Sequence, residues 1–203
     1  MNDLSTYFKF LMPKHTQFDQ SKILESLIPL FIDKGYNGTS MQDIVDRTQL
    51  NRSSLYNTFG DKYQLYRAVL NKYAERQDGI ANQILSLDMD VQKALRKFLM
   101  SLFADETPDE QQRGCLLTKC TLELSGDEGV IQKLLKTSKT VMIQALQQVV
   151  ETGQERNDIN PAIQSYQMAL FIYNTIQGLR IMNAHEFDKA ETELIIDSLF
   201  QQF

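Results

Sequence analysis

The sequence predicts an all-α protein of about nine helices, in which an N-terminal three-helix head precedes a larger C-terminal helical body. Apolar residues recur at helical spacing along most of the 203 residues, which is the primary signal of amphipathic helices. Glycines, prolines and typical N-cap residues separate these segments. No segment shows a convincing strand alternation, internal repeat or low-complexity tract, so the predicted fold contains no sheet.

Composition and charge are those of a folded, acidic protein. Apolar residues make up 42% of the chain and charged residues 23%, which is ordinary for globular proteins. The net charge is −5, but nine Lys and Arg face eight Asp and Glu through residue 75, whereas the remainder has 12 against 18. An acidic body with a near-neutral head suits a protein that touches nucleic acid with one end only.

Signals for export, disulfide bonding and metal binding are absent from the sequence. The start, MNDLSTYFKFLMPKH, lacks the continuous apolar core of a signal peptide, and the longest apolar run, at residues 27–32, is far shorter than a membrane span. Two cysteines are too few for a disulfide scaffold, and the two histidines are far apart. We therefore expect a cytoplasmic protein with no membrane association, metal site or cofactor.

Residues 1–16 are expected to form a flexible N-terminal arm. Pro13 interrupts any helix there, and chain termini are commonly poorly ordered. Lys9, Lys14 and His15 could alternatively follow a DNA minor groove, as the N-terminal arms of some DNA-binding proteins do. A frayed terminus is the interpretation that we favour.

The first helix is predicted at about residues 18–34. Gly35 follows it in the place of a C′ glycine, which commonly ends a helix. The buried stripe of this helix is expected to consist of Ile23, Leu24, Leu27, Ile28 and Phe31.

Capping residues divide residues 39–66 into three helical segments. Ser40 begins the first segment, and Asp43 follows at the spacing of a capping box. Asn51 caps the second segment and Asp61 caps the third. Two short helices joined by a tight turn, followed by a longer helix, are typical of a helix-turn-helix domain.

The second of these helices, at residues 52–58, has a polar outer face suited to a DNA major groove. Arginine pairs with guanine, asparagine pairs with adenine, and hydroxyl groups pair with either. Tyr56 and Lys62 stand just outside this face, where a phenol and an ammonium group can reach phosphates. A small helical hairpin with a solvated polar face is the structural alternative. The candidate DNA contacts are Thr39, Ser40, Asn51, Arg52, Ser53, Ser54, Tyr56, Asn57, Thr58 and Lys62.

An ordered set of residues between positions 35 and 65 carries a family resemblance. It comprises Gly35-Tyr36, Thr39-Ser40, Asp43-Ile44, Leu55-Tyr56, Phe59, Asp61-Lys62 and Leu65. This set resembles the N-terminal domain of TetR-type (TetR/AcrR) transcriptional repressors. The resemblance implies a DNA-binding domain at residues 17–75 and a ligand-binding and dimerisation domain at residues 76–203.

Two positions depart from the family pattern. Gln49 occupies a turn position that is usually glycine, and a left-handed backbone there would cost about 1 kcal/mol. Ser53 stands where relatives often have glycine or proline. Both departures change how the second helix is held, and they leave the base preference open.

Six further helices are predicted from residue 61 onward. The first of them continues from the head into the body, which makes it a natural element for coupling the two. The predicted ranges are 61–85, 91–104, 114–124, 130–152, 161–183 and 188–203.

The last two predicted helices are apolar on nearly all sides, which indicates burial against more than one neighbour. A fully internal core is one explanation. We favour a two-fold homodimer through a four-helix bundle, the arrangement that the resemblance implies, with two heads addressing half-sites of a near-palindromic operator. The candidate interface residues are Leu170, Ile176, Gly178, Leu179, Met182, Ile195, Ile196, Leu199, Phe200 and Phe203.

The middle helices are expected to enclose a mainly apolar cavity with a few polar groups. The resemblance implies that a small-molecule inducer binds there and releases the operator DNA. Core packing is an equally good explanation for each candidate residue. The candidates are Phe98, Leu102, Phe103, Cys115, Leu116, Lys119, Glu123, Met142, Met168, Phe171, Tyr173, Asn174 and Gln177.

Cys115 supports a second hypothesis. The segment RGCLLTK resembles one found in a subgroup of the family that includes electrophile- and oxidant-sensing repressors, in which the cysteine after the glycine is the sensor. Arg113 and Lys119 could lower its thiol pKa if they approach it. The alternative is a buried structural cysteine.

Two other functional classes receive little support. We find no Ser/His/Asp order, glycine-rich phosphate loop or paired-histidine metal motif, so we do not expect an enzyme. A helical adaptor that binds protein through the head is disfavoured, because the polar face of the second helix lacks the aromatic anchors of a protein-binding hot spot.

Overall fold

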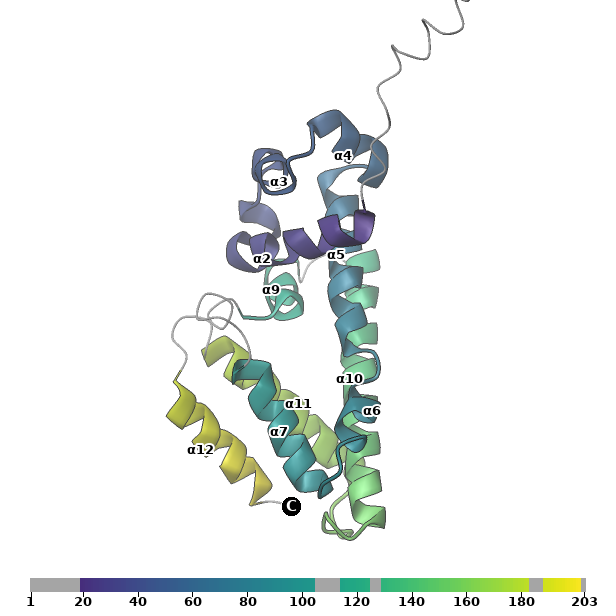
Figure 1. Cartoon of the computed structure of the whole chain (residues 1–203), viewed down its shortest axis with the longest axis vertical. Helices are drawn as coiled ribbons and strands as arrows, with labels where there is room; N and C mark the ends of the chain where they lie inside the picture. The colour runs from purple at the N-terminus through teal and green to yellow at the C-terminus, as the bar shows by residue number, and fades with distance from the viewer. Residues whose placement is uncertain (1–18, 105–113, 125–128, 183–187, 202–203) are drawn as a thin grey trace, which may run out of the picture.

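The structure, a computed structural model, describes residues 19–104, 114–124, 129–182 and 188–201. These residues form ten α-helices and one short 3₁₀ helix, with no strand among them, so the all-α prediction is confirmed. The molecule is elongated, with a small head of α2–α5 at one end and the body below it (Figure 1). The expected arm at residues 1–16 lies outside the described residues. No helix in the described part of the chain is long and apolar enough to cross a membrane.

The head consists of α2 (Gln20–Gly38), α3 (Met41–Thr48), α4 (Arg52–Phe59) and α5 (Lys62–Ala74). The predicted caps are all present. Ser40 and Asp43 form the complete capping box, Asn51 Oδ1 accepts the Ser54 N–H at 2.8 Å, and Asp61 Oδ1 accepts a backbone N–H one turn on. Because each helix start is fixed by a side chain, the three short helices have defined boundaries.

Buried side chains from all four head helices form a single apolar cluster. Phe31 of α2 and Tyr66 of α5 pack with ring centroids 4.8 Å apart. The fully buried members include Leu27, Phe31, Ile44, Leu55, Leu65, Tyr66, Val69 and Leu70.

One predicted helix is divided in the structure. The segment predicted as a single helix at residues 61–85 consists of α5, the 3₁₀ helix η1 (Glu75–Gln77) and α6 (Ile80–Leu85). Asp78 is extended and Gly79 is left-handed at φ +76°. An Asp-Gly pair is a turn signal, and here it outweighed the apolar periodicity. The connection between head and body therefore consists of short helices joined by a turn, in place of one continuous helix.

The body contains α7 (Val91–Ala104), α9 (Leu116–Glu123), α10 (Val130–Glu155), α11 (Ser165–Met182) and α12 (Lys189–Phe200). The long helix α10 runs the length of the body and reaches the head (Figure 1). It packs most extensively against α11 and also contacts α6 and α7. The helix predicted to begin at Pro161 begins at Ser165 instead, after a turn closed by the Ile163 N–H and the Asn160 carbonyl.

Helix α9 belongs to the apolar core of the head, although it lies in the C-terminal half of the sequence. Cys115, Leu116, Leu117 and Cys120 are buried in the cluster that holds the head together, and Ile131 near the start of α10 joins it, while the rest of the body forms a separate core. The head is therefore completed by a segment of the body.

Polar contacts fix α9 to the end of the straight part of α2. The Lys119 ammonium donates to the Ile32 and Asp33 carbonyls at 2.7 Å each. The Glu123 carboxylate accepts the Tyr36 N–H at 2.6 Å. Terminal carbonyls of a helix lack intrahelical partners, and a cation near them is stabilising. Gly35, at φ +71° and ψ 179°, interrupts α2 at this point, which frees the groups that α9 binds.

Substituting Gly35 should test this junction. Only glycine readily adopts the backbone conformation found there, and an added Cβ would lie 1.8 Å from Glu123 Oε1. Gly35→Ala is expected to lower the free energy of unfolding by about 1–3 kcal/mol, measured by urea unfolding followed by circular dichroism. The control is Gly38→Ala, because a Cβ on Gly38 meets only the Lys34 Cβ, at 3.7 Å. Equal losses in the two variants would contradict this account of Gly35.

Candidate functional site

The turn between α3 and α4 is closed by a left-handed residue. Gln49 has φ 58° and ψ 18°, and its N–H bonds the Val45 carbonyl at 2.8 Å. Gln49 therefore does adopt the left-handed conformation that the family's usual glycine would adopt more readily. The Gln49 side chain also donates to the Asp46 carbonyl at 2.6 Å, so this residue adds a second bond to the turn that glycine would lack.

Helix α4 is held by its apolar side and presents its polar side to solvent. Leu55 is 1% exposed, while Arg52, Ser53, Tyr56 and Asn57 are exposed. The helix lies at the far end of the head, with no body helix over it (Figure 1). Short polar side chains on such a helix permit close approach to the edges of bases in a major groove.

Two candidate DNA contacts have partners within the head. An Arg52 guanidinium nitrogen donates to Gln42 Oε1 at 3.3 Å, which leaves further N–H donors on the same group. The Lys62 ammonium lies 4.4 Å from the ring centroid of Tyr36. These contacts orient both cations without neutralising them.

The structure contradicts the predicted DNA contact of Thr39, and it places Gln42 beside the candidate contact Arg52. Thr39 is 1% exposed, and its hydroxyl donates to the Gly35 carbonyl at 2.6 Å, so its side chain supports the junction with α9. Ser40 is exposed but serves as the α3 cap. Gln42 lies beside Arg52 and was missed, because residues on different helices become neighbours only through the packing of α3 on α4.

Helix α3 is fixed to α2 by two charged side chains. The Lys34 ammonium bonds the Asp43 carboxylate, and Arg47 Nε donates to the Ser26 carbonyl at 2.9 Å. The hydrogen bonds from Lys34 and then from Ser40 hold the pKa of the Asp43 carboxyl well below its usual range. The orientation of the helix-turn-helix therefore depends on an ionised Asp43.

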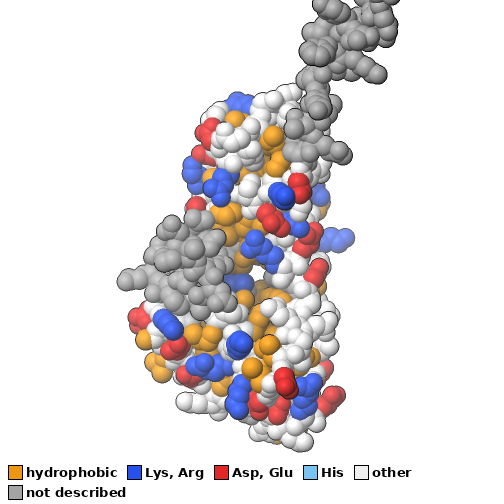
Figure 2. All heavy atoms as spheres, in the orientation of Figure 1, with side chains coloured by type: hydrophobic (Ala, Val, Ile, Leu, Met, Phe, Trp, Pro, Cys, Tyr) orange, Lys and Arg blue, Asp and Glu red, His pale blue; other side chains and the backbone are white. Residues whose placement is uncertain are grey.

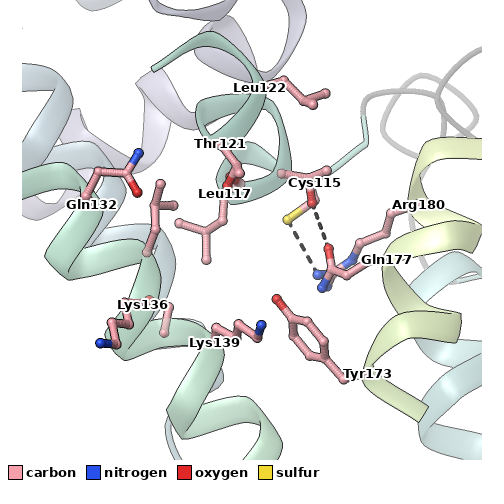
Figure 3. Close-up of a pocket in the computed structure, with 13 residues that line it drawn as sticks. Cys115, Leu117, Thr121, Leu122, Gln132, Lys136, Lys139, Tyr173, Gln177 and Arg180 are labelled. Atoms are coloured by element: carbon pink, nitrogen blue, oxygen red, sulfur yellow. Dashed lines mark hydrogen bonds between the residues drawn. The ribbon is translucent and has the colours of Figure 1, made fainter. Parts of the chain in front are cut away.

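A second candidate site is a cavity of about 520 Å³ among α9, α10 and α11. Figure 3 shows its lining from these helices, and Figure 2 shows a hollow below the head with basic and hydrophobic side chains beside it. The lining residues are Cys115, Leu117, Thr118, Thr121, Leu122, Gln132, Leu135, Lys136, Ser138, Lys139, Tyr173, Gln177 and Arg180.

Three of the predicted ligand contacts line this cavity, namely Cys115, Tyr173 and Gln177. The structure places the others elsewhere. Lys119 and Glu123 bind α2, and Leu116 is buried in the head core. The body core contains Phe98, Leu102, Phe103, Met142 and Met168, whereas Phe171 and Asn174 are exposed on the outer face of α11.

Sequence reasoning missed most of the polar lining. Thr118 and Thr121 share a face of α9, while Ser138, Lys139 and Arg180 come from α10 and α11. Each has an ordinary spacing on its own helix, and only the packing of three helices brings them together. The repeated hydroxyl residues in GCLLTKCTLEL were the one available signal of a polar face.

Cys115 is held in the cavity wall by polar neighbours. Its sulfur accepts from an Arg180 guanidinium nitrogen at 3.4 Å and from the Tyr73 hydroxyl at 3.7 Å. Burial alone would raise the pKa of the thiol, but the Arg180 charge and hydrogen bonds from Thr118 and Tyr73 hold it below its ordinary value. Cys115 is only 5% exposed, and both cysteines are free.

The outer face of α11 and α12 carries several exposed apolar side chains in the part of the chain that the structure describes. Phe171, Ile181, Met182 and Leu194 are each half exposed or more, and a Cβ at Gly178 would meet nothing within 4 Å. Of the predicted interface residues, Ile176, Leu179, Ile196 and Leu199 are instead buried in the chain's own core, Leu170, Ile195 and Phe200 are half-buried, and Phe203 lies outside the described residues.

Family models match both parts of the chain. Residues 23–69 match the model for bacterial regulatory proteins of the tetR family, and residues 91–199 match the tetracyclin repressor-like C-terminal domain. The HTH-type transcriptional repressor ComR of Escherichia coli (strain K12) is 30% identical over 165 residues, which cover 81% of this chain and 79% of ComR. The chain belongs to the TetR family of bacterial transcriptional regulators.

Solved structures agree on the fold. A cysteine-substituted form of the TetR-family regulator CifR, complexed with a 26-base-pair operator DNA, has a TM-score of 0.72 at 19% identity and covers 95% of this chain and 100% of its own. NemR from E. coli, in its reduced form, has a TM-score of 0.77 at 17% identity, with 90% and 96% covered. Membership places the chain among DNA-binding transcriptional regulators, a class distinct from enzymes.

Among the described residues, no group of three or more His, Cys, Asp or Glu could hold a metal ion. The two histidines, His15 and His185, lie outside the described residues.

The ionised state of Asp43 makes a prediction about acid stability. A carboxyl whose pKa is lowered on folding stabilises the fold above its unfolded pKa of about 3.9, and this stabilisation is lost as pH falls through the folded value. The wild-type urea midpoint should therefore drop between about pH 5 and about pH 2.5. Asp43→Asn should show a smaller drop than Asp46→Asn, an exposed carboxylate of the same helix. An equal drop in both variants would mean that Asp43 is not the group responsible.

Proposed function

We propose that the protein is a ligand-responsive transcriptional repressor that binds a near-palindromic operator as a homodimer and is released by a small-molecule inducer. The observation that carries the DNA-binding part is α4, an exposed polar helix held by Leu55 and an Asn51 cap at the end of the head. A protein that binds an operator in a bacterium would act in the cytoplasm, where the DNA lies.

Four side chains of α4 are the proposed base readers. Arg52, Ser53 and Asn57 are exposed and Thr58 is half-buried, and together they present guanidinium, amide and hydroxyl groups on α4. Asn51 and Ser54 belong to the start of the same helix, where the backbone approaches DNA. Tyr56 and Lys62 would contact phosphates, and Ser40 would do so from the cap of α3.

The apolar outer face of α11 and α12 supports the proposed homodimer. Exposed apolar side chains that lie together on a protein surface mark interaction sites. Phe171, Gly178 and Met182 recur at spacings of seven and four on α11, and Leu194 extends the face on α12. A two-fold contact through this face would place both heads on the same side of the dimer and suit half-sites about 34–36 Å apart.

Helix α9 provides the proposed route from ligand to DNA. One side of α9 lines the cavity with Leu117, Thr118 and Thr121, and other positions hold α2 through Lys119 and Glu123. A ligand that shifts α9 must therefore shift α2 or break these bonds. Such a ligand favours a head spacing unsuited to the operator, and by reciprocity operator binding weakens ligand binding.

The redox-sensing alternative through Cys115 is not favoured. The lowered thiol pKa would suit a reactive cysteine, but a side chain that is 5% exposed offers an electrophile little access. The sulfur is already the acceptor for Arg180 and Tyr73. These contacts agree better with a structural role in the cavity wall.

Selection of bound genomic fragments tests the proposal, and one substitution tests the base reading. The wild type should recover a near-palindromic sequence at about 150 mM salt. Arg52→Ala should weaken operator binding by about 1–3 kcal/mol and leave binding to random DNA nearly unchanged, measured by fluorescence anisotropy. Equal losses on both DNAs would exclude base reading by Arg52.

Lys62→Ala should act differently, because a phosphate contact carries no sequence information. It should weaken binding to all sequences and reduce the salt slope of log K by about one. Lys97→Ala, an exposed lysine on α7, is the matched control and should change neither quantity. An unchanged slope in Lys62→Ala would remove Lys62 from the interface.

The dimer face makes a separate prediction. Replacing Phe171 and Leu194 together by Glu should convert the proposed dimer into a 23.4-kDa monomer, measured by sedimentation velocity, because charged side chains would be buried unpaired. Val130→Glu changes a similarly exposed apolar residue at the start of α10 and should leave the mass unaltered. A doubly substituted chain that sediments like the wild type would place the interface elsewhere.

A further inference from the structure

The cavity among α9, α10 and α11 has a strongly one-sided charge. Among the described residues that line it, the charged ones are Lys136 and Lys139 of α10 and Arg180 of α11, and none is Asp or Glu. The chain as a whole is acidic, with a net charge of −5. A cluster of three cations around one cavity therefore runs against the average charge of the protein.

Two of the cations, Lys139 and Arg180, point into the cavity, where a bound molecule would contact them. Figure 3 shows Lys139 and the Tyr173 hydroxyl on one side of the cavity, with Arg180 and Gln177 reaching in from α11. Lys139 makes no ion pair with any other described residue, and its solvent-exposed position leaves all three N–H groups usable. Arg180 is anchored by the Cys115 sulfur at 3.4 Å, which fixes its direction.

The neutral polar groups around these cations include several donors. Burial and the nearby Cys115 thiol raise the pKa of Tyr173, so its hydroxyl remains protonated. Ser138 is 7% exposed, which places its hydroxyl in a desolvated part of the wall. Thr118 donates to Gln177 Oε1 at 2.7 Å, and this bond leaves the Gln177 amide nitrogen available as a donor.

The remaining wall is apolar. Leu117 and Leu122 approach from α9, and Leu135 approaches from α10. Leu122 is 73% exposed, an unusual state for leucine beside a cavity, and a bound apolar group would cover it. The cavity volume of about 520 Å³ lies within the range of sites for small organic ligands.

We propose that the effector of this protein is an amphiphilic organic anion, with a carboxylate bound by Arg180 and Lys139 and an apolar body against Leu117, Leu122 and Leu135. The planar guanidinium matches a carboxylate by two parallel hydrogen bonds, and Lys139 adds a second positive charge. The inference rests on the proposed function, since it names the ligand class of the same cavity.

This assignment also explains how the ligand would reach the head. Its anion would join α10 to α11, while its apolar body would press on α9 from below the junction with α2. Arg180 would have to divide its donors between the ligand and the Cys115 sulfur. Binding would therefore alter the position of α9, whose Lys119 and Glu123 hold the head.

Isothermal titration calorimetry with the full chain and four probes of equal chain length tests the proposal. The probes are decanoate, decyl phosphate, neutral decanamide and cationic decylamine. Decanoate should bind at least tenfold more tightly than decanamide, and decylamine should not bind. Decyl phosphate separates a general anion site from a carboxylate site. Tighter binding of decyl phosphate than of decanoate would overturn the carboxylate assignment.

Variants locate the anion. Lys139→Met, at an exposed position, should weaken decanoate binding about tenfold or more, and Arg180→Met should weaken it further. Lys133→Met removes an exposed lysine of the same helix that does not line the cavity, so it should bind decanoate like the wild type. Equal affinity in Lys139→Met and Lys133→Met would overturn the anion assignment.

Operator binding separates this inference from the proposed function. If the protein selects specific DNA but decanoate and decyl phosphate fail to bind, the regulator stands and the anionic ligand is wrong. If decanamide or decylamine binds and releases the DNA, the ligand class is likewise overturned. If no specific DNA is selected, the proposed function fails whatever the calorimetry shows.

Discussion

The attachment of α9 to the end of α2 is the constraint on which the rest of the structure depends. Lys119 binds the terminal carbonyls of α2, Glu123 binds the Tyr36 N–H, and the glycine at position 35 opens the backbone between them. Cys115 to Cys120 also complete the apolar core of the head. The head is therefore not an independent module, since its stability and its orientation both include a helix of the body.

This arrangement explains why the two candidate sites are not separate. Helix α9 has eight residues, and its positions alternate between the cavity wall and the junction with α2. Any molecule that occupies the cavity contacts the element that holds the head. The second connection, α5 to α6, is interrupted at Asp78 and Gly79, so it transmits motion less rigidly than a continuous helix would. In the proposed function, the short helix α9 is therefore the element that would couple ligand binding to the head, beside the contacts that α10 makes with α5.

Local signals predicted much of the head, and tertiary packing decided what they missed. The caps at Ser40, Asn51 and Asp61 depend on neighbours within a few residues, so the sequence was sufficient to predict them. The end of the first helix at Gly35 was predicted, but Thr39 was misassigned because the sequence does not show that its hydroxyl turns inward to the Gly35 carbonyl. The cavity and the outer face of α11 depend on how three or four helices pack, and periodicity reports which positions are apolar without saying which neighbour covers them.

The most direct test compares wild type with a Lys119→Met, Glu123→Gln double variant on the selected near-palindrome and on a single half-site. Two heads held at a fixed spacing should prefer the palindrome strongly, because the second head binds at high effective concentration. The account predicts that the double variant loses this preference by on the order of tenfold, with half-site affinity unchanged. A palindrome preference equal to that of the wild type would contradict the claim that α9 sets the position of the head.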